Sequence, residues 1–133
     1  METDENGEIY VTGSYYQSLD IDPSSNENML TSTGLDLFFS KYTENGDLLW
    51  ARNIPNCTNL GEATDIDLTA DDHIYISGYF GNTLDFDVGS GIYNLVATTA
   101  ADRYFAKYSN NGEFIWANRI DVNSDFALEW KSW

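Results

Sequence analysis

The chain has 133 residues, enough for one ordinary domain, and carries 22 acidic against 6 basic side chains, for a formal net charge of −16. That charge repels nucleic-acid phosphates and anionic membrane surfaces, and no apolar run is long enough to span a bilayer. Hydrophobic residues nonetheless make up 42% of the chain and aromatic residues 15%, too many for a disordered acidic tail. The sequence therefore predicts a folded acidic protein that binds no nucleic acid and does not insert into membranes.

Cysteine content and the first residues give two further expectations. Cys57 is the single cysteine, so no intrachain disulfide and no cysteine-based metal cluster can form. It follows Pro55-Asn56 in a predicted loop, where a passive thiol is expected. Met1–Glu5 is mostly acidic and lacks an apolar stretch, so no signal peptide is expected in this sequence.

In the first half, short runs of β-branched and aromatic residues alternate with turn residues, which is the pattern of an all-β protein. The Asn45-Gly46 pair predicts a tight hairpin, since Asn and Gly supply the positive φ values that such a turn needs. Only Met1–Thr3 precede the Asn6-Gly7 turn, so a full first strand is missing. The predicted strands are Glu8–Tyr15, Leu37–Thr43 and Asp47–Ile54.

The second half carries the same pattern with a complete first strand. Asp71-Asp72 is expected to turn the first strand into the second, and Asn110–Gly112 the third into the fourth. Between these hairpins Gly81–Ala101 predicts a longer excursion, in which Tyr93–Ala97 is a candidate for a short extra strand. The predicted strands are Ala63–Thr69, His73–Phe80, Arg103–Ser109 and Glu113–Ile120.

The second half repeats the first, which is the strongest signal in the sequence. Ile9–Gly13 returns as Ile74–Gly78 at an offset of 65, and Asp36–Ile54 returns as Asp102–Ile120 at an offset of 66. A duplication of this length is typical of stacked units that bury their apolar faces against one another. Phe126–Trp130 resembles the start of the second copy. The predicted units, which we call blades, are a first blade at 1–54, a complete second blade at 55–120 and the first strand of a further blade at 121–133.

Bulky neighbours such as Phe38-Phe39 and Tyr104-Phe105 place apolar side chains on both faces of one sheet. A sheet with one face in water would alternate more cleanly, so each sheet is expected to lie between similar sheets. Four-stranded antiparallel units stacked in this way are the blades of a β-propeller. The predicted fold is all-β, with about two blades of a partial propeller cut out of phase. A two-sheet sandwich is the alternative.

Four motifs of the first copy resemble a bacterial β-propeller repeat, the SBBP repeat. They are Ile-Tyr-Val-Thr-Gly from Ile9, Leu-Asp-Ile-Asp-Pro from Leu19, Asp-Leu-Phe-Phe-Ser-Lys-Tyr from Asp36 and Asn-Gly-Asp-Leu-Leu-Trp-Ala from Asn45. The second copy is similar to the repeat at the equivalent positions. The resemblance implies a secreted or cell-surface bacterial protein, of the kind found mostly in Bacteroidetes. It supplies no catalytic residues to carry over.

Two blades are fewer than the four to eight of a closed propeller, so an apolar face is expected to stay open on each side. Leaving one Phe or Leu exposed forgoes about 1.5–3 kcal/mol of burial free energy. Two explanations stay open. Either the sequence is part of a longer array, or the C-terminal strand of one chain completes the first blade of the next.

The Asp-x-Asp spacing of Asp20 and Asp22 returns as Asp85 and Asp87. On extended chain both carboxylates of such a pair point to the same side, and nearby loop carbonyls would complete an oxygen cage for Ca²⁺. The alternative is structural, with the carboxylates accepting hydrogen bonds from turn amides. These four aspartates are the candidate calcium ligands, and no other cofactor is expected.

Aromatic residues supply a candidate ligand surface. Tyr15 and Tyr16 lie where a strand enters its long loop, and Tyr79 and Phe80 stand at the equivalent place in the second copy. Aromatic side chains on loop-bearing edges are typical of binding surfaces.

Two further residue types recur between the copies. Trp50 and Trp116 lie on the last strand and are expected to pack between blades, with stacking against a sugar as the alternative. Lys41 and Lys107 are expected to form ion pairs with a carboxylate on a neighbouring strand. The expected partners are Asp36 and Asp102.

The sequence holds no nucleophile elbow, phosphate-binding loop or zinc-binding helix motif, and its sole histidine, His73, has no second metal ligand beside it. The chain is therefore not expected to be an enzyme. The favoured hypothesis is a non-catalytic extracellular propeller segment that acts as a scaffold or protein-interaction module. Its expected partners are a protein or glycan, further blades of the same array, or other copies of the chain. The alternative is a calcium- or carbohydrate-binding adhesion module.

Overall fold

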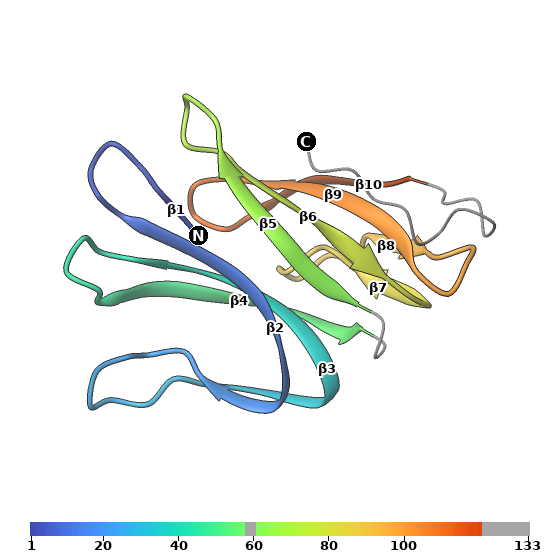
Figure 1. The fold of residues 1–133 in the computed structure, drawn as a ribbon, viewed down its shortest axis with the longest axis horizontal. Helices are drawn as coiled ribbons and strands as arrows, with labels where there is room; N and C mark the ends of the chain where they lie inside the picture. The colour runs from blue at the N-terminus through green and yellow to red at the C-terminus, as the bar shows by residue number, and fades with distance from the viewer. Residues whose placement is uncertain (58–60, 121–133) are drawn as a thin grey trace.

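The computed structural model describes residues 1–57 and 61–120, and its regular elements are all β-strands (Figure 1). They are β1 (Glu2–Thr3), β2 (Ile9–Asp20), β3 (Met29–Tyr42), β4 (Leu48–Cys57), β5 (Glu62–Leu68), β6 (Ile74–Phe80), β7 (Thr83–Asp85), β8 (Asn94–Val96), β9 (Asp102–Tyr108) and β10 (Phe114–Ile120). No helix in the described ranges has the length and apolar character needed to cross a membrane.

The strands form two antiparallel four-stranded sheets and one hairpin. The first sheet has the order β1-β2-β3-β4, the second has the order β5-β6-β9-β10, and β7 pairs only with β8. The all-β prediction is confirmed, and so is the short extra strand predicted near Tyr93. The first strand of the first sheet, β1, is two residues long. The further blade predicted at 121–133 lies outside the described residues.

Four of the hairpins share one turn geometry. Each turn has one residue of positive φ, whose amide donates to the carbonyl three residues earlier. The side-chain oxygen of the residue that begins the turn accepts the amide four residues on, which holds both ends of the turn. The positive-φ residues are Gly7, Gly46, Asp72 and Gly112, and the residues that begin the turns are Asp4, Thr43, Thr69 and Ser109.

The expectation that both residues of an Asn-Gly pair take positive φ is wrong. Gly46 has φ of +88° and Gly112 of +78°, whereas Asn45 and Asn111 are not among the residues of positive φ. One left-handed residue after a β-turn is the geometry of a three-residue hairpin loop with a bulge. Asp72 fills the same position at φ of +60°, which Asp tolerates better than most residues.

The repeat in the sequence is also a repeat in backbone conformation. Gln17 and Asn82, 65 positions apart, both have positive φ, at +63° and +55°. In the first copy the pairing of β2 with β3 continues beyond Gln17 and forms the outer end of the β2–β3 hairpin. In the second copy the ladder between β6 and β9 ends at Phe80, and the equivalent outer end becomes the separate β7–β8 hairpin.

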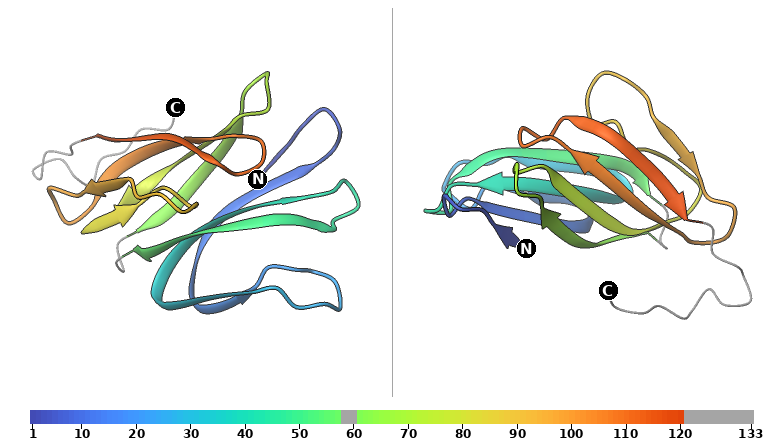
Figure 2. Two further views of the ribbon diagram at one scale, coloured as in Figure 1. Left: turned by 180° about the vertical axis from the view of Figure 1, so that it is seen from behind. Right: turned by 90° about the horizontal axis from the view of Figure 1, so that it is seen from above.

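The two sheets lie against each other and share one hydrophobic core, and β7 packs beside β4 (Figures 1 and 2). Alternate residues of each strand supply this core, as expected where one face of a sheet is covered. The core residues from the first sheet include Tyr10, Leu37, Phe39 and Ile54. Those from the second sheet and its hairpin include Ile66, Ile74, Ile76, Phe80, Leu84, Phe86, Tyr104, Ala106, Tyr108 and Ala117.

The first sheet packs against the second sheet on one face, and its other face is only partly covered, by its own β2–β3 loop. Every residue of β3 from Leu35 to Lys41 is buried, and the neighbours Phe38 and Phe39 belong to two different clusters on opposite faces. Phe38 packs with Tyr15 and with Ile21, which begins the loop joining β2 to β3.

The second sheet differs, because only one of its faces is covered by the described residues. In β6 and β9 buried residues alternate with partly or fully exposed ones. Tyr104 is buried against the first sheet, while its neighbour Phe105 faces outward and is 37% exposed. The expectation that each sheet lies between similar sheets is therefore wrong, because in the described residues each sheet has the other sheet on one face only.

Candidate interaction surface

The contact between the sheets is built around aromatic rings of both copies. The ring of Phe39 lies 4.5 Å from the ring of Tyr108 and 5.7 Å from that of Trp50, between centroids. Trp50 also reaches the β9–β10 turn, since a Cβ placed on Gly112 would lie 3.0 Å from its ring. Trp50 thus packs between the two sheets, as its sequence position predicts.

A polar cluster borders the same contact where the β9–β10 turn meets the first sheet. Asn110 donates through Nδ2 to the hydroxyl of Tyr10 at 2.7 Å and accepts from Nζ of Lys41 at 3.0 Å. Arg52 donates to the carbonyl of Asn111 at 2.7 Å, and its guanidinium lies over the ring of Trp50. These bonds fix the register of one sheet on the other.

Lys41 is the buried charge in this cluster. Its Nζ lies 2.5 Å from Oε2 of Glu8, and its side chain is nearly inaccessible. Burial alone would lower the pKa of Lys41, but the bonds to Glu8 and Tyr10 outweigh it and raise the pKa above its usual value. The lysine therefore stays charged at the sheet contact.

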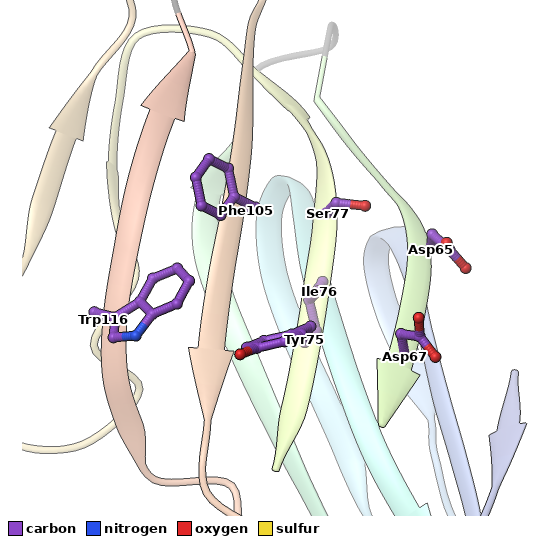
Figure 3. Close-up of a pocket in the computed structure, with 7 residues that line it drawn as sticks. All are labelled: Asp65, Asp67, Tyr75, Ile76, Ser77, Phe105 and Trp116. Carbon is purple, nitrogen blue, oxygen red and sulfur yellow. The ribbon is translucent and has the colours of Figure 1, made fainter. Parts of the chain in front are cut away.

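The outer face of the second sheet holds a pocket of about 360 Å³ (Figure 3). Its aromatic wall is formed by Tyr75 on β6, Phe105 on β9 and Trp116 on β10, and Trp116 lies 5.9 Å from Tyr75 and 5.6 Å from Phe105 between ring centroids. Figure 3 shows the exposed carboxylates of Asp65 and Asp67 on β5, at the opposite side of the pocket. The pocket therefore combines an aromatic wall with two acids.

This outer face repeats, residue by residue, the face of the first sheet that is already covered. Tyr10, Phe39 and Ile54 are 0%, 0% and 1% exposed in the sheet contact. Their equivalents Tyr75, Phe105 and Ile120 are 37%, 37% and 45% exposed. A face that one sheet covers in the first copy is thus open in the second. We call the outward-facing residues Tyr75, Phe105, Trp116 and Ile120 the outer face.

The candidate calcium ligands lie in two equivalent loops and bind loop amides. Oδ1 of Asp20 accepts the amides of Asp22 and Asn28, both at 3.1 Å, and Asp22 accepts that of Ser24 at 2.9 Å. In the second copy, Oδ1 of Asp85 accepts the amides of Asp87 and Tyr93, and Asp87 accepts that of Gly89. These bonds favour the alternative that the four aspartates stabilise their loops by accepting hydrogen bonds from backbone amides. Within residues 1–57 and 61–120, no group of three or more His, Cys, Asp or Glu side chains is placed to hold a metal ion.

Each loop is tied to its sheet by an equivalent tyrosine. The hydroxyl of Tyr42 donates to the carbonyl of Ile21 at 2.9 Å, and that of Tyr108 donates to the carbonyl of Phe86 at 2.7 Å. Ile21 and Phe86 are the middle residues of the two Asp-x-Asp sequences, and both are buried. The acids therefore hold a loop whose central apolar residue anchors it to the core.

The four aromatic residues of the predicted ligand surface divide into two kinds. Tyr15 and Phe80 are buried, at 7% and 0% exposure, whereas Tyr16 is exposed and Tyr79 is intermediate. Tyr79 donates to Glu62 at 2.6 Å. The structure does not gather the four into one surface, because Tyr15 and Phe80 face the cores.

The predicted ion pairs of the lysines are not the ones observed. Lys41 binds Glu8, and Lys107 lies over the ring of Tyr75 at 5.4 Å. Both expected partners have bonds of their own. The carboxylate of Asp36 accepts from Asn53 and Tyr15, and that of Asp102 accepts from Arg119, Thr98 and Thr99.

In the bonds around the two expected partners, Tyr15 and Asp102 have shifted pKa values. Burial, and after it the charge of Asp36, raises the pKa of Tyr15 to about 12. Burial would raise the pKa of Asp102, but hydrogen bonds from Thr98, Thr99 and Arg119 outweigh it and hold the pKa below its usual value. Asp102 is therefore a buried, charged and fully bonded carboxylate.

Sequence reasoning missed Tyr75, Phe105 and Lys107 as members of one surface. The signal that would have found them is the repeat itself, which pairs each core residue of the sheet contact with a residue of the outer face. A comparison with models of known protein families finds no match, and a comparison with curated proteins finds none either. In the residues that the structure describes, the fold is all-β, with two similar antiparallel four-stranded sheets and a hairpin.

Proposed function

We propose that this chain is a non-catalytic extracellular segment of β-propeller repeats that acts as a scaffold or protein-interaction module. The observation that carries the proposal is the outer face, whose aromatic residues repeat those buried between the sheets. Contiguous apolar surface rimmed by polar groups is typical of protein-interaction sites. The extracellular placement and the propeller rest on the resemblance of the repeat motifs.

A second candidate function has its own support. The pocket beside Trp116 sets aromatic rings against the carboxylates of Asp65 and Asp67, a combination that suits a sugar ring. In this alternative, the loops that hold Asp20 and Asp22, and Asp85 and Asp87, would bind the calcium ions. It makes the chain a calcium- or carbohydrate-binding adhesion module.

Binding of the chain to arrays of extracellular proteins and of glycans, with and without Ca²⁺, separates the two functions. The scaffold function predicts a protein ligand whose binding is calcium-independent and is lost on Phe105→Ser. The adhesion function predicts a glycan ligand whose binding is lost on Trp116→Ala or on removal of Ca²⁺. Retention of every binding signal in Phe105→Ser would overturn the first proposal.

A further inference from the structure

We propose that the outer face of the second sheet binds the first sheet of a second copy of this chain, head to tail, with Glu44 of one chain beside Lys107 of the next. The inference rests on the proposed function and names the partner for that surface. Four observations carry it: the receiving face, the entering face, the turn between them and the charges that meet there.

The receiving face already exists in an occupied form within the chain. Phe39, whose ring meets that of Trp50, receives the ring of Tyr108 from the next sheet. Phe105 and Trp116 hold the equivalent positions at an offset of 66, and their rings meet at 5.6 Å and 86° as those of Phe39 and Trp50 meet at 5.7 Å and 85°. The aromatic rings of the outer face therefore already have the arrangement of the equivalent rings in the occupied contact.

The entering face is supplied by the far side of the first sheet. Tyr42 stands there for Tyr108, and its hydroxyl is held by a loop carbonyl in the same way. Among the other entering residues of the second sheet, Ile74, Ile76, Ala106 and Ala117 have as equivalents Ile9, Val11, Ser40 and Ala51. Ile66 of β5 also enters the contact, and its equivalent is Met1, beside the two-residue β1. Over β2, β3 and β4 the exchange is between residues of similar size, so packing of the same kind can form between chains along these three strands.

The turn that enters the contact leaves room for its partner. Gly112 lies against Trp50 and Arg52, with 3.0 Å from an added Cβ to each. The equivalent glycine, Gly46, has nothing within 4 Å of such a Cβ, and the turn around it is exposed. The β3–β4 turn is thus free to approach Trp116 of another chain as the β9–β10 turn approaches Trp50.

The charges at this turn favour a second copy. Asn110 accepts a hydrogen bond from Lys41 in the occupied contact, at 3.0 Å. Glu44 is the equivalent of Asn110 and is exposed, and Lys107 is the equivalent of Lys41. In the proposed contact a carboxylate therefore replaces the amide opposite the lysine, and the pair gains an ionic attraction.

The overall charge opposes the association of these chains. Each carries a net charge of −16, so contact is weakest at low ionic strength. Salt at about 0.1 M shortens the range of this repulsion to about 10 Å. A head-to-tail contact of this kind builds closed rings or open filaments, because each chain keeps one free face of each type.

Sedimentation velocity over a wide range of chain concentrations, at one fixed physiological ionic strength, tests the contact. The unaltered chain is expected to form oligomers as its concentration rises. Lys107→Glu and Glu44→Lys each place like charges opposite one another and should weaken association about tenfold or more. The double variant Lys107→Glu/Glu44→Lys restores opposite charges and should recover most of it, as should an equal mixture of the two single variants.

Glu27→Lys is the matched control. It changes the net charge as Glu44→Lys does, and its equivalent Ile92 is 77% exposed, so position 27 lies outside the proposed contact. This variant should associate at least as well as the unaltered chain. Circular dichroism and thermal unfolding are the checks that each variant keeps the fold.

A chain that stays monomeric up to its solubility limit would overturn the proposal, and so would a double variant as weak as the single ones. Monomers would leave the outer face to residues 121–133 or to another protein. The arrays described above would then still report whether the face binds a protein, so failure of self-association and failure of the proposed function are distinct results.

Discussion

The ring of Tyr108 in β9 lies 4.5 Å, centroid to centroid, from the ring of Phe39 in β3, and both residues are 0% exposed. Through this pair the two copies of the repeat share one core. The hydroxyl of Tyr108 also donates to the carbonyl of Phe86, so the same residue ties the β7–β8 hairpin to the second sheet. Neither copy could bury its aromatic residues to this extent alone.

Phe39→Ala should destabilise the chain far more than Phe105→Ala. Removal of a fully buried Phe costs about 3–5 kcal/mol, whereas Phe105 already faces outward and its removal should cost less than about 1.5 kcal/mol. Urea unfolding at low chain concentration, where association is weakest, measures both. Equal losses would mean that the outer face is covered in solution.

Gly112→Asn should be more destabilising than Gly46→Asn. Asn tolerates the positive φ that both positions require, so the free-energy cost of the backbone conformation is similar in the two variants. Only at position 112 does the new Cβ meet Trp50 and Arg52, and overpacking of this kind costs about 1–3 kcal/mol. The difference in the free energy of unfolding between the two variants measures how tightly the turn is docked. A difference near zero would contradict the close approach.

Asp102→Asn should lower stability at neutral pH and flatten its acid dependence. The pKa of Asp102 is lowered in the folded chain, so its carboxylate stabilises the fold above the unfolded pKa of about 3.9. That contribution is lost as the pH falls from about 4 through the lower folded pKa. The urea midpoint, followed from neutral pH down to the acid limit, should fall less steeply in the variant.

Asp47→Asn, which alters an exposed carboxylate, is the control for this experiment. It should leave the slope of the acid limb close to that of the unaltered chain. An Asp102→Asn variant with the same acid dependence as this control would show that Asp102 does not stabilise the fold through its charge.

Asp85→Ala should destabilise the chain by about 1–2 kcal/mol, because the amides of Asp87 and Tyr93 lose their shared acceptor. Asp85→Asn should cost less, since the side-chain carbonyl still accepts. On the scaffold function, calorimetric titration with Ca²⁺ gives no heat for the unaltered chain or for either variant. Heat of binding that disappears in Asp85→Asn would support the calcium-binding alternative instead.

Much of the fold could be predicted from the sequence, because strands and turns follow from local residue patterns. The turn at Gly112 and the strand around Tyr93 lie where the sequence predicts them. The tertiary contacts were harder to predict from the sequence. Lys41 was expected to meet Asp36 or Asp102 but binds Glu8, since repetition of a lysine indicates that it has a partner without indicating which.

The sequence by itself determined that two similar all-β units exist, where their strands and turns lie, and that aromatic residues recur between them. Only the tertiary structure decided which copy of each aromatic residue is covered. Phe39 and Phe105 hold equivalent positions in similar local sequences, yet one is buried and the other exposed. The reason is that burial depends on the sheet stacked above a residue, and that neighbour comes from a distant part of the chain.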